Sequence, residues 1–292
     1  MREYRNAVMD NARWRGFKPR GGDIFVCTPP KCGTTWMQVI VANLLWQDGE
    51  FPGPIVNGIC PWIEAKFMPA DVMHQMLEEQ THRRAMKSHT PADGIPWFPE
   101  AKYITVARDG RDAFMSWCNH VLRMKMIEEL NAQAEKDGIP PMTTFDGSDY
   151  HGYFRHWLSN NNYFDVVASY WQRRHEPNLL LVHYNDLKAN LEAEIRRLAA
   201  FLDIQVEASL WPPLVERCTF EGMRKADKRI GDFAKAFEGG IEGFMFKGMN
   251  GRWRDVLDAD DLSAYQQRLE ASLPAEAADW VTRGGAALAG ES

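Results

Sequence analysis

The chain of 292 residues carries 34 Lys and Arg against 40 Asp and Glu, which gives a formal net charge of -6. This acidic balance argues against a general nucleic-acid-binding protein, because such domains usually carry a basic excess. The hydrophobic fraction of 45% is sufficient for a large core, and the length allows one large domain or two small ones. The continuous alternation of elements described below favours one domain over residues 1–292.

Neither a membrane-spanning helix nor a secretory signal is expected. The sequence has no apolar stretch of about 18 residues, and the charged segment 1–20 lacks the apolar core of a signal peptide. The cysteines are scattered and form no Cys-x-x-Cys pair, which is typical of a reduced, cytoplasmic protein. They are Cys27, Cys32, Cys60, Cys118 and Cys218.

Short β-rich runs alternate with amphipathic segments along the chain. In order, we expect a strand at 23–27, a helix at 34–47, strands at 85–89 and 103–107, a helix at 113–130, a strand at 179–182 and a helix at 191–202. This alternation predicts an α/β fold with a central parallel sheet and helices on both faces. In such sheets ligands bind beyond the carboxyl ends of the strands, so the residues that directly follow the strands are candidates for function.

Three segments interrupt this alternation. Gly and Pro residues break up residues 131–165, which we interpret as a mobile, loop-rich insertion, and the asparagines at 160–162 add turn signals. Four glycines make residues 223–243 a second loop-rich segment. The small residues of 284–292 predict a frayed tail.

The stretch Thr-Pro-Pro-Lys-Cys-Gly-Thr-Thr-Trp at 28–36 joins the first strand to the first helix. Backbone N–H groups at a helix N-terminus are unpaired, and the helix dipole adds partial positive charge there. Gly33 allows close approach of a ligand to the backbone, and Thr34 and Thr35 add hydroxyl donors. Lys31 adds a full charge, so the loop predicts an anion-binding cradle. The lysine precedes the glycine, which is not the Walker order.

Lys87 and His89 are two residues apart on the second expected strand and therefore project to the same face. Histidine is the side chain best suited to accept a hydroxyl proton near neutral pH. By itself the pair is more typical of a surface lysine and a hydrogen-bonded histidine. The pair supports a catalytic site only together with the other motifs.

Arg108 follows the third strand, and Ser116 comes eight residues later in the next helix. The planar fork of a guanidinium group suits a phosphate ligand. The ordinary alternative is that Arg108 pairs with Asp109 or Asp112 at the start of the helix. The neighbouring Arg111 is easily mistaken for the ligand.

Six motifs in this order resemble those of the cytosolic-type sulfotransferases that use 3′-phosphoadenosine 5′-phosphosulfate (PAPS). That family carries Pro-Lys-Ser/Ala-Gly-Thr-Thr-Trp after one strand, Lys-Thr/Ser-His after the next, and an Arg and a Ser eight residues apart. The other three matching motifs are His183-Tyr-Asn-Asp186, Cys218-Thr-Phe-Glu-Gly-Met-Arg224, and Phe244-Met-Phe-Lys-Gly248 followed by Gly251-Arg-Trp-Arg254. The set spans residues 28–254 and identifies the chain as a member of this family, with a P-loop-like three-layer fold.

The resemblance implies an enzyme that moves a sulfuryl group in line from PAPS to a hydroxyl or amine and leaves 3′-phosphoadenosine 5′-phosphate (PAP). It implies that His89 takes the proton of the acceptor, that Lys31 stabilises the leaving phosphate and that Lys87 stabilises the sulfuryl oxygens. Ser116 would draw Lys31 away until the acceptor arrives. The implied cofactor-binding residues are Lys31, Cys32, Gly33, Thr34, Thr35, Trp36, Arg108, Ser116, Tyr184, Thr219, Phe220, Met223, Phe246, Lys247 and Gly248.

The chain departs from the family pattern at three positions of these motifs. Asn185 stands in place of a glutamate, and Phe246 stands where the family usually has an arginine that contacts the 3′-phosphate. Arg252 replaces an aspartate. We hypothesise that Arg252 compensates for the arginine missing at Phe246.

The acceptor is less defined than the donor. Residues 61–64, Pro-Trp-Ile-Glu, resemble a family step beside the acceptor, and Trp62, Phe67, Met68 and the insertion after Met124 are expected to line an apolar cleft. A small molecule, a lipid and a glycan all stay open as acceptors, and so does the oligomeric state. No metal is expected, because lysines and backbone amides supply the positive charge. The alternatives are a P-loop-like nucleotide phosphotransferase (kinase) and a non-catalytic nucleotide sensor.

Overall fold

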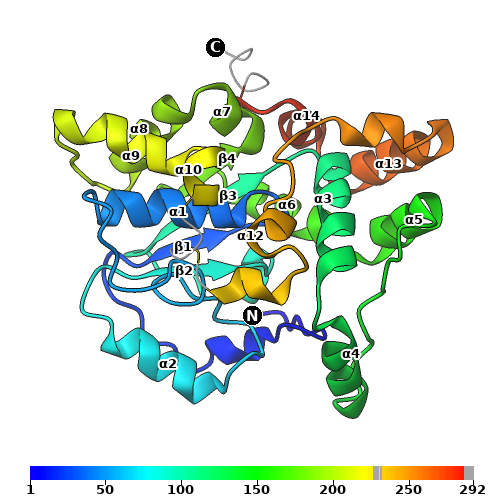
Figure 1. Cartoon of the computed structure of the whole chain (residues 1–292), viewed down its shortest axis with the longest axis horizontal. Coiled ribbons are helices and arrows are strands. Elements are labelled where there is room, and N and C mark those ends of the chain that lie inside the picture. The colour runs from blue at the N-terminus through cyan, green and yellow to red at the C-terminus, as the bar shows by residue number, and fades with distance from the viewer. Residues whose placement is uncertain (226–229, 231, 286–292) are drawn as a thin grey trace.

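The computed structural model describes residues 1–225, 230 and 232–285 (Figure 1). At the centre of this described part is a four-stranded sheet whose strand pairs are all parallel. Its order is β2 (Ala85–Ser88), β1 (Ile24–Cys27), β3 (Lys102–Ala107) and β4 (Leu179–His183). The expected α/β fold with a central parallel sheet is confirmed.

The sheet separates two apolar cores. Ile24 and Val26 of β1 join Ile104 of β3 in one core, whereas Phe25 of β1 and Tyr103 of β3 belong to the other. Successive residues of a strand project to opposite faces, so these buried strands require an apolar layer on each side. The three-layer arrangement of helix, sheet and helix follows from this requirement.

Helices from distant parts of the chain supply the layers (Figure 1). The first core contains residues of α1 (Thr34–Leu45), α8 (Leu191–Phe201), α9 (Trp211–Cys218) and α10 (Phe220–Lys225). The second contains residues of α2 (Ala70–Glu79) and α6 (Tyr163–Gln172). A third cluster joins α3 (Gly110–Arg123), α5 (Tyr150–Asn160), α13 (Ala259–Ser272) and α14 (Ala275–Arg283). The other helices include α4 (Ile127–Lys136), α7 (Tyr184–Ala189) and α12 (Gly240–Phe244).

The register of the sheet brings the ends of all four strands to one edge. Cys27 at the end of β1 lies opposite Ser88 of β2 and Thr105 of β3, and Ala107 of β3 lies opposite His183 of β4. The residues that follow these strands therefore share one side of the molecule. This is the edge at which parallel α/β sheets bind ligands.

The helix expected at 113–130 is in fact two helices. Helix α3 ends at Arg123, and α4 begins at Ile127. Between them the backbone pairs with a distant segment, because the N–H of Lys125 donates to the carbonyl of Ala236 and the N–H of Glu238 donates to the carbonyl of Arg123. This tertiary pairing replaces helical hydrogen bonds, and the local sequence carries no Gly or Pro that would announce it.

The interpretation of residues 131–165 as a loop-rich insertion was wrong for its first residues, 131–136, which belong to α4, and for its second half. Helix α5 lies inside it, and the carboxylate of Asp149 caps its N-terminus by accepting a hydrogen bond from the N–H of Gly152 at 2.8 Å. Four of its aromatic and aliphatic side chains are buried at helical spacing. The turn expected at 160–162 is confirmed, since α5 ends at Asn160 and α6 begins at Tyr163.

Residues 223–243 and the C-terminal tail are described in part. The first segment contains the 3₁₀ helix η4 (Asp232–Ala236) and the start of α12, whereas 226–229 and 231 lie outside the described residues. The N–H of Gly285 donates to a carboxylate oxygen of Asp186 at 2.8 Å. The rest of the expected frayed tail, 286–292, lies outside the described residues. In the described residues, no helix is both long enough and apolar enough to cross a membrane.

Candidate active site

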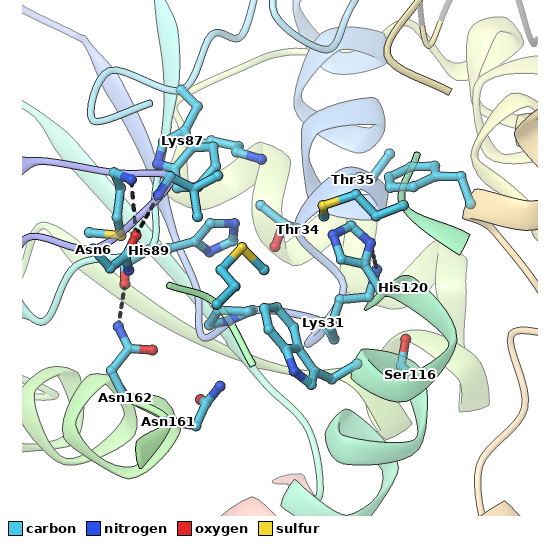
Figure 2. Close-up of a pocket in the computed structure, with 18 of the residues that line it drawn as sticks. Asn6, Lys31, Thr34, Thr35, Lys87, His89, Ser116, His120, Asn161 and Asn162 are labelled. Atoms are coloured by element: carbon cyan, nitrogen blue, oxygen red, sulfur yellow. Dashed lines mark hydrogen bonds between the residues drawn. The ribbon is translucent and has the colours of Figure 1, made fainter. Parts of the chain in front are cut away.

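A cavity of about 680 Å³ lies at the carboxyl edge of the sheet. It is lined by residues from the ends of all four strands and by residues of α3. Figure 2 shows Lys31, His89 and Ser116 on its wall. Most of the predicted site residues meet here. They are Lys31, Gly33, Thr34, Thr35, Trp36, Lys87, His89, Arg108, Ser116, Tyr184, Phe220, Met223 and Gly248.

The loop before α1 has the backbone geometry that the predicted anion cradle requires. Lys31 has a φ of +68° and Gly33 has a φ of +106°, and these left-handed residues turn the chain sharply into the helix. A Cβ atom on Gly33 would lie 3.0 Å from the ring of Tyr184, so a larger residue would crowd the cradle. In the described part of the chain, no side chain caps the N-terminus of α1. Its first N–H groups are therefore suited to hold a phosphate.

Lys31 is a partly buried lysine among other cations. Burial, with repulsion from Lys87 and Arg108, lowers the pKa of Lys31 to about 7. Its ammonium group lies 3.1 Å from Nδ1 of His120, a residue of α3 that the sequence motifs did not single out (Figure 2). An anion bound beside Lys31 would relieve this repulsion and favour the charged ammonium form.

His89 is held in one tautomer by the backbone. Its Nδ1 lies 2.8 Å from the carbonyl oxygen of Thr28, which can only accept, so Nδ1–H is the donor. The neutral ring therefore carries its lone pair on Nε2. Burial, together with the charge of Lys87, lowers the pKa of His89 to about 3. The imidazole is consequently neutral near pH 7 and able to accept a proton.

Lys87 lies next to His89 on the same cavity wall. Its ammonium group is 4.5 Å from the centre of the Trp62 ring, and burial lowers its pKa to about 8. The Trp62 ring also meets the edge of the His89 ring, with 4.9 Å between centroids. Trp62 thus contacts both side chains of the Lys-x-His pair and fixes their separation.

Glu64 lies behind this wall and forms hydrogen bonds with its residues. The sequence motifs alone did not indicate this role. The side chain is fully buried, and its two oxygens accept hydrogen bonds from the indole N–H groups of Trp14 and Trp62 at 2.9 and 2.6 Å. The hydroxyl of Ser88 donates to it at 2.5 Å. Burial raises the pKa of Glu64. This carboxyl therefore ties Trp62 to the end of β2, between Lys87 and His89.

Arg108 remains at the cavity and does not pair with its neighbouring aspartates. Its guanidinium group donates to Oδ1 of Asn250 at 2.6 and 3.0 Å and lies 4.2 Å from the centre of the Tyr184 ring. Arg111 is the residue that pairs with Asp109, at 2.5 Å. The sequence interpretation of Arg108 as the ligand-facing arginine fits this arrangement, and Asn250 is a partner that the motifs did not indicate.

A family model described as "Sulfotransferase domain" matches residues 21–278 of the chain. The match covers the sheet and nearly all of the cavity wall. The chain belongs to the sulfotransferase domain family. The prediction of a sulfotransferase enzyme is confirmed, and the kinase and sensor alternatives lose their support.

Curated relatives align with most of this sulfotransferase. A "Glycolipid sulfotransferase" of Mycobacterium bovis is 29% identical over 96% of this chain and 94% of its own length. The mouse protein "Sulfotransferase 1B1" is 28% identical over 82% of this chain and 79% of its own length.

Solved structures share the fold of the sulfotransferase. Mouse sulfotransferase SULT7A1, solved as a complex with PAP, has a TM-score of 0.68 and 18% identity, covering 92% of this chain and 90% of its own. A retinol dehydratase, solved with androsterone and inactive cofactor PAP, has a TM-score of 0.71 and 20% identity, covering 91% and 87%. The expected three-layer sulfotransferase fold is thereby confirmed.

Some of the predicted cofactor-binding residues of the sulfotransferase do not line the cavity. The thiol of Cys32 is fully buried in the core beside α3, and the hydroxyl of Thr219 caps α10 by accepting a hydrogen bond from the N–H of Gly222 at 2.9 Å. Phe246 and Lys247 lie outside the lining as well. Cofactor contacts by these residues stay predictions.

The compensating role of Arg252 also stays a prediction. Its guanidinium group lies 4.9 Å from the centre of the Phe246 ring, so the two residues that depart from the family pattern are in contact. If Arg252 holds the 3′-phosphate, the Arg252→Ala variant will bind PAP about tenfold or more weakly, since a charge-assisted hydrogen bond is lost. Calorimetric titration with PAP measures this, and an unchanged affinity would remove Arg252 from the site.

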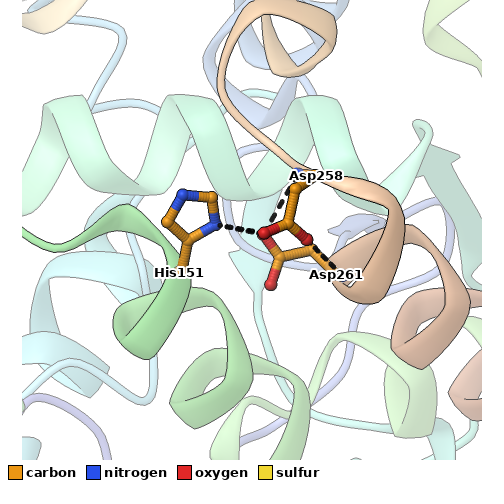
Figure 3. Close-up of side chains that lie close together, drawn as sticks. All are labelled: His151, Asp258 and Asp261. Carbon is orange, nitrogen blue, oxygen red and sulfur yellow. Dashed lines mark hydrogen bonds and ion pairs between the residues drawn. The ribbon is translucent and has the colours of Figure 1, made fainter.

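A second cluster of polar groups lies outside the cavity of the sulfotransferase, where α5 meets α13 (Figure 3). Nδ1 of His151 lies 2.5 Å from a carboxylate oxygen of Asp261 and 3.5 Å from one of Asp258. Asp258 and Asp261 also form the capping box of α13. Arg155 approaches the other oxygen of Asp261 at 3.7 Å. We interpret the cluster as a tie between two helices, because an imidazolium and a guanidinium already neutralise the carboxylates.

This tie predicts a pH-dependent contribution to stability. The hydrogen bond to Asp261 raises the pKa of His151, so protonated His151 stabilises the fold below its ordinary pKa, and this contribution is lost as the pH rises through the raised value. We therefore expect the His151→Asn variant to melt a few degrees lower than the native chain at pH 6 and by much less at pH 9. Melting curves at both pH values test this. An equal difference at both would show that the ion pair is not responsible.

Proposed function

We propose that this chain transfers the sulfuryl group of PAPS to a hydroxyl group of an amphipathic, sugar-bearing acceptor, with His89 as the base. Membership of the family makes it a PAPS-dependent sulfotransferase. The observation that carries the finer proposal is the placement of His89, Lys31 and Lys87 on the wall of one cavity. Among the described residues, the hydrogen bonds of the His89 ring are made by Nδ1, which leaves Nε2 to act as a base.

The residues present fit the donor. The N-terminus of α1 with Thr34 and Thr35 would hold its 5′-phosphate, and Arg108 and Ser116 would hold its 3′-phosphate. Tyr184 and the ring of Phe220 would contact the purine. Gly248 has a φ of +59°, and a Cβ atom there would lie 2.8 Å from the ring of Phe220. The glycine therefore leaves the face of that ring accessible.

The chain's own groups supply the proton acceptor and the positive charge for the reaction. PAPS when bound provides the sulfuryl group and a phosphate leaving group. His89 would take the proton of the acceptor hydroxyl through Nε2 as the new oxygen–sulfur bond forms. Lys31 would neutralise the negative charge that develops on the leaving phosphate, and Lys87 would neutralise the sulfuryl oxygens. Both act best as preorganised ammonium groups in a site that excludes water.

The acceptor end of the cavity combines an apolar wall with carboxamides. Met126 directly before α4, Leu130 within α4 and the segment 140–142 are apolar lining. Asn161 and Asn162 lie near His89, and the side-chain amide of Asn162 donates to the His89 carbonyl at 3.0 Å (Figure 2). Carboxamides both donate and accept hydrogen bonds, which suits sugar hydroxyls. The name of the mycobacterial relatives, glycolipid sulfotransferase, supports an acceptor with both parts.

Two measurements test the proposal in sequence. Calorimetric titration with PAP in EDTA, against ATP with magnesium, examines the donor, and we expect tight binding of PAP and weak binding of ATP. Transfer from labelled PAPS to octyl glucoside and to 1-octanol then examines the acceptor. We expect a preference of at least about tenfold for the glucoside. Its sugar hydroxyls can pair with the amide group of Asn161 and the amide oxygen of Asn162, whereas their other polar atoms already bond to Tyr163 and His89, and a plain alcohol has no sugar hydroxyls to offer.

The Asn161→Leu variant should lose this preference, whereas a preference for 1-octanol in the native chain would overturn the sugar-bearing acceptor and leave the donor untouched. Preference for ATP with magnesium would overturn the sulfotransferase mechanism itself. A cytoplasmic location also belongs to this proposal, because all five cysteines are buried free thiols, as expected in a reducing compartment.

The pKa of Lys31 predicts how the affinity for PAP depends on pH. In the ligand-free protein Lys31 has a pKa of about 7, and Lys87 has one of about 8. A bound phosphate favours their charged forms, so binding takes up protons above pH 7 and the affinity falls as the pH rises. We expect a decline approaching about tenfold per pH unit for each lysine that titrates. In Lys31→Met the decline should begin about one unit later, which calorimetry from pH 6 to 9 measures.

A further inference from the structure

The principal lysine of the cavity has a partner that the motifs did not indicate. Lys31 was expected to interact with Ser116, yet its ammonium group lies 3.1 Å from Nδ1 of His120. His120 comes one helical turn after Ser116 on α3, so both side chains project from the same face of that helix into the cavity (Figure 2). The two are therefore rival partners for one lysine.

The surroundings of His120 keep its ring in place. The ring stacks on that of Trp117, with 5.8 Å between centroids, and packs against Phe237 at 4.7 Å and Phe244 at 6.3 Å. Phe244 also lies 5.2 Å from the ammonium group of Lys31. Aromatic rings thus surround both groups, and they leave the imidazole nitrogen as the polar atom that the ammonium group meets.

The charge around this pair makes His120 a neutral acceptor. Lys31, Lys87 and His89 face it from the cradle and from the end of β2, and burial with these charges lowers the pKa of His120 well below its ordinary value. Arg108 donates to the backbone carbonyl of Lys31 at 3.4 Å. A neutral imidazole that meets an ammonium group must accept through Nδ1 and carry its proton on Nε2. This tautomer is the opposite of that of His89.

We propose that His120 is the positioning residue of Lys31, holding the ammonium group in the ligand-free enzyme and releasing it to the phosphosulfate. The proposal rests on the function proposed above and assigns to His120 a role that Ser116 was expected to fill. Within the described residues, no carboxylate forms an ion pair with Lys31. This suits the task, because a carboxylate would repel the donor's phosphates and would hold the lysine too tightly to release it.

The test compares two replacements of His120. Asparagine keeps an acceptor oxygen near the position of Nδ1, whereas phenylalanine keeps a ring and removes the acceptor. In His120→Phe the ligand-free lysine loses its partner, so PAP no longer competes with the imidazole. We expect PAP to bind this variant about threefold to tenfold more tightly at pH 6, the equivalent of one hydrogen bond. The pH above which its affinity falls should also move lower, because an unpartnered buried ammonium is less stable.

The asparagine variant should stay within about twofold of the native chain in both measurements. A shared change in both variants, or an unchanged affinity and pH profile in a folded His120→Phe protein, would overturn the proposal. If Ser116→Ala produces the expected tightening instead, the serine is the partner. Failure of the native chain to bind PAP would refute the function proposed above and, with it, the role of His120, whereas the variant outcomes refute the role of His120 alone.

A second measurement observes the tautomers directly. Nitrogen chemical shifts of histidine-labelled native protein report the tautomer of each imidazole. The chain has eight histidines, and the His89→Asn and His120→Phe spectra identify the signals of these two rings. We expect the His89 ring to be protonated at Nδ1 and the His120 ring at Nε2, and the Nδ1 signal of His120 to move when PAP is added. Should the His120 ring be protonated at Nδ1 before PAP is added, it cannot accept from Lys31 and the proposal fails.

Discussion

Replacement of His89 by asparagine is expected to lower turnover by about 10²–10⁴-fold while the affinity for PAP persists. The asparagine amide can still donate to the carbonyl of Thr28, as Nδ1 of His89 does at 2.8 Å. What the variant loses is Nε2, the nitrogen that carries the lone pair in the neutral ring. The loss therefore falls on proton transfer and not on the shape of the cavity.

Initial rates at saturating PAPS and calorimetry with PAP together measure this prediction. His175→Asn is the matched control, because His175 is an exposed histidine that lies outside the cavity lining. Its activity should equal that of the native chain. Near-native turnover in His89→Asn would remove the histidine from the mechanism. A parallel loss of PAP binding would show instead that His89 supports the donor site.

Replacement of Lys31 by methionine is expected to lower turnover by about 10²–10³-fold. Methionine fills nearly the same volume and removes the ammonium group that would meet the leaving phosphate. Lys31 also has a φ of +68°, a backbone conformation that residues other than glycine rarely adopt. The surrounding loop must therefore hold the backbone of Lys31 in this conformation. Because the charge acts on the developing phosphate, the effect should appear mainly in the turnover number and only partly in the affinity for PAP.

The control for this change is Lys18→Met, which removes an exposed ammonium group that pairs with Glu78 on the surface. Both variants change the net charge equally, so a difference between them reports position and not total charge. Turnover of Lys31→Met within about tenfold of native would show that the backbone amides and Lys87 stabilise the leaving group without it. In that case positioning of Lys31 by His120 would also have no effect on turnover.

Much of the candidate site was predictable because it is local in sequence. The strand, loop and helix of residues 24–45 are continuous in the chain, and the geometry of such a unit places Lys31 and Gly33 at the helix N-terminus. Lys87 and His89 follow from the alternation of a strand in the same way. The motifs at Arg108 and Tyr184 each directly follow a strand of the parallel sheet. Because the strands are parallel, the motifs that follow them meet at the same edge of the sheet.

The helix boundaries after residue 123 were less predictable. A continuous amphipathic pattern suggested one helix through Leu130, but the backbone at Lys125 bonds to Ala236, which is remote in sequence. Similarly, the Gly and Pro residues before Tyr150 led to the prediction of a loop, so α5 was not expected. The buried residues of α5 at helical spacing were the signal that could have revealed it.

The family, the strand ends that carry functional groups and the types of those groups were all predictable, because each depends on residues that are near neighbours in the chain. Which side chains hold those groups follows instead from the packing of distant segments. His120 meets Lys31 across 89 residues, and Asn250 meets Arg108 across 142. Such partners depend on how helices pack, which no local pattern encodes. They also fix the tautomers and lower the pKa values, because both follow from burial and from the charges that packing brings together.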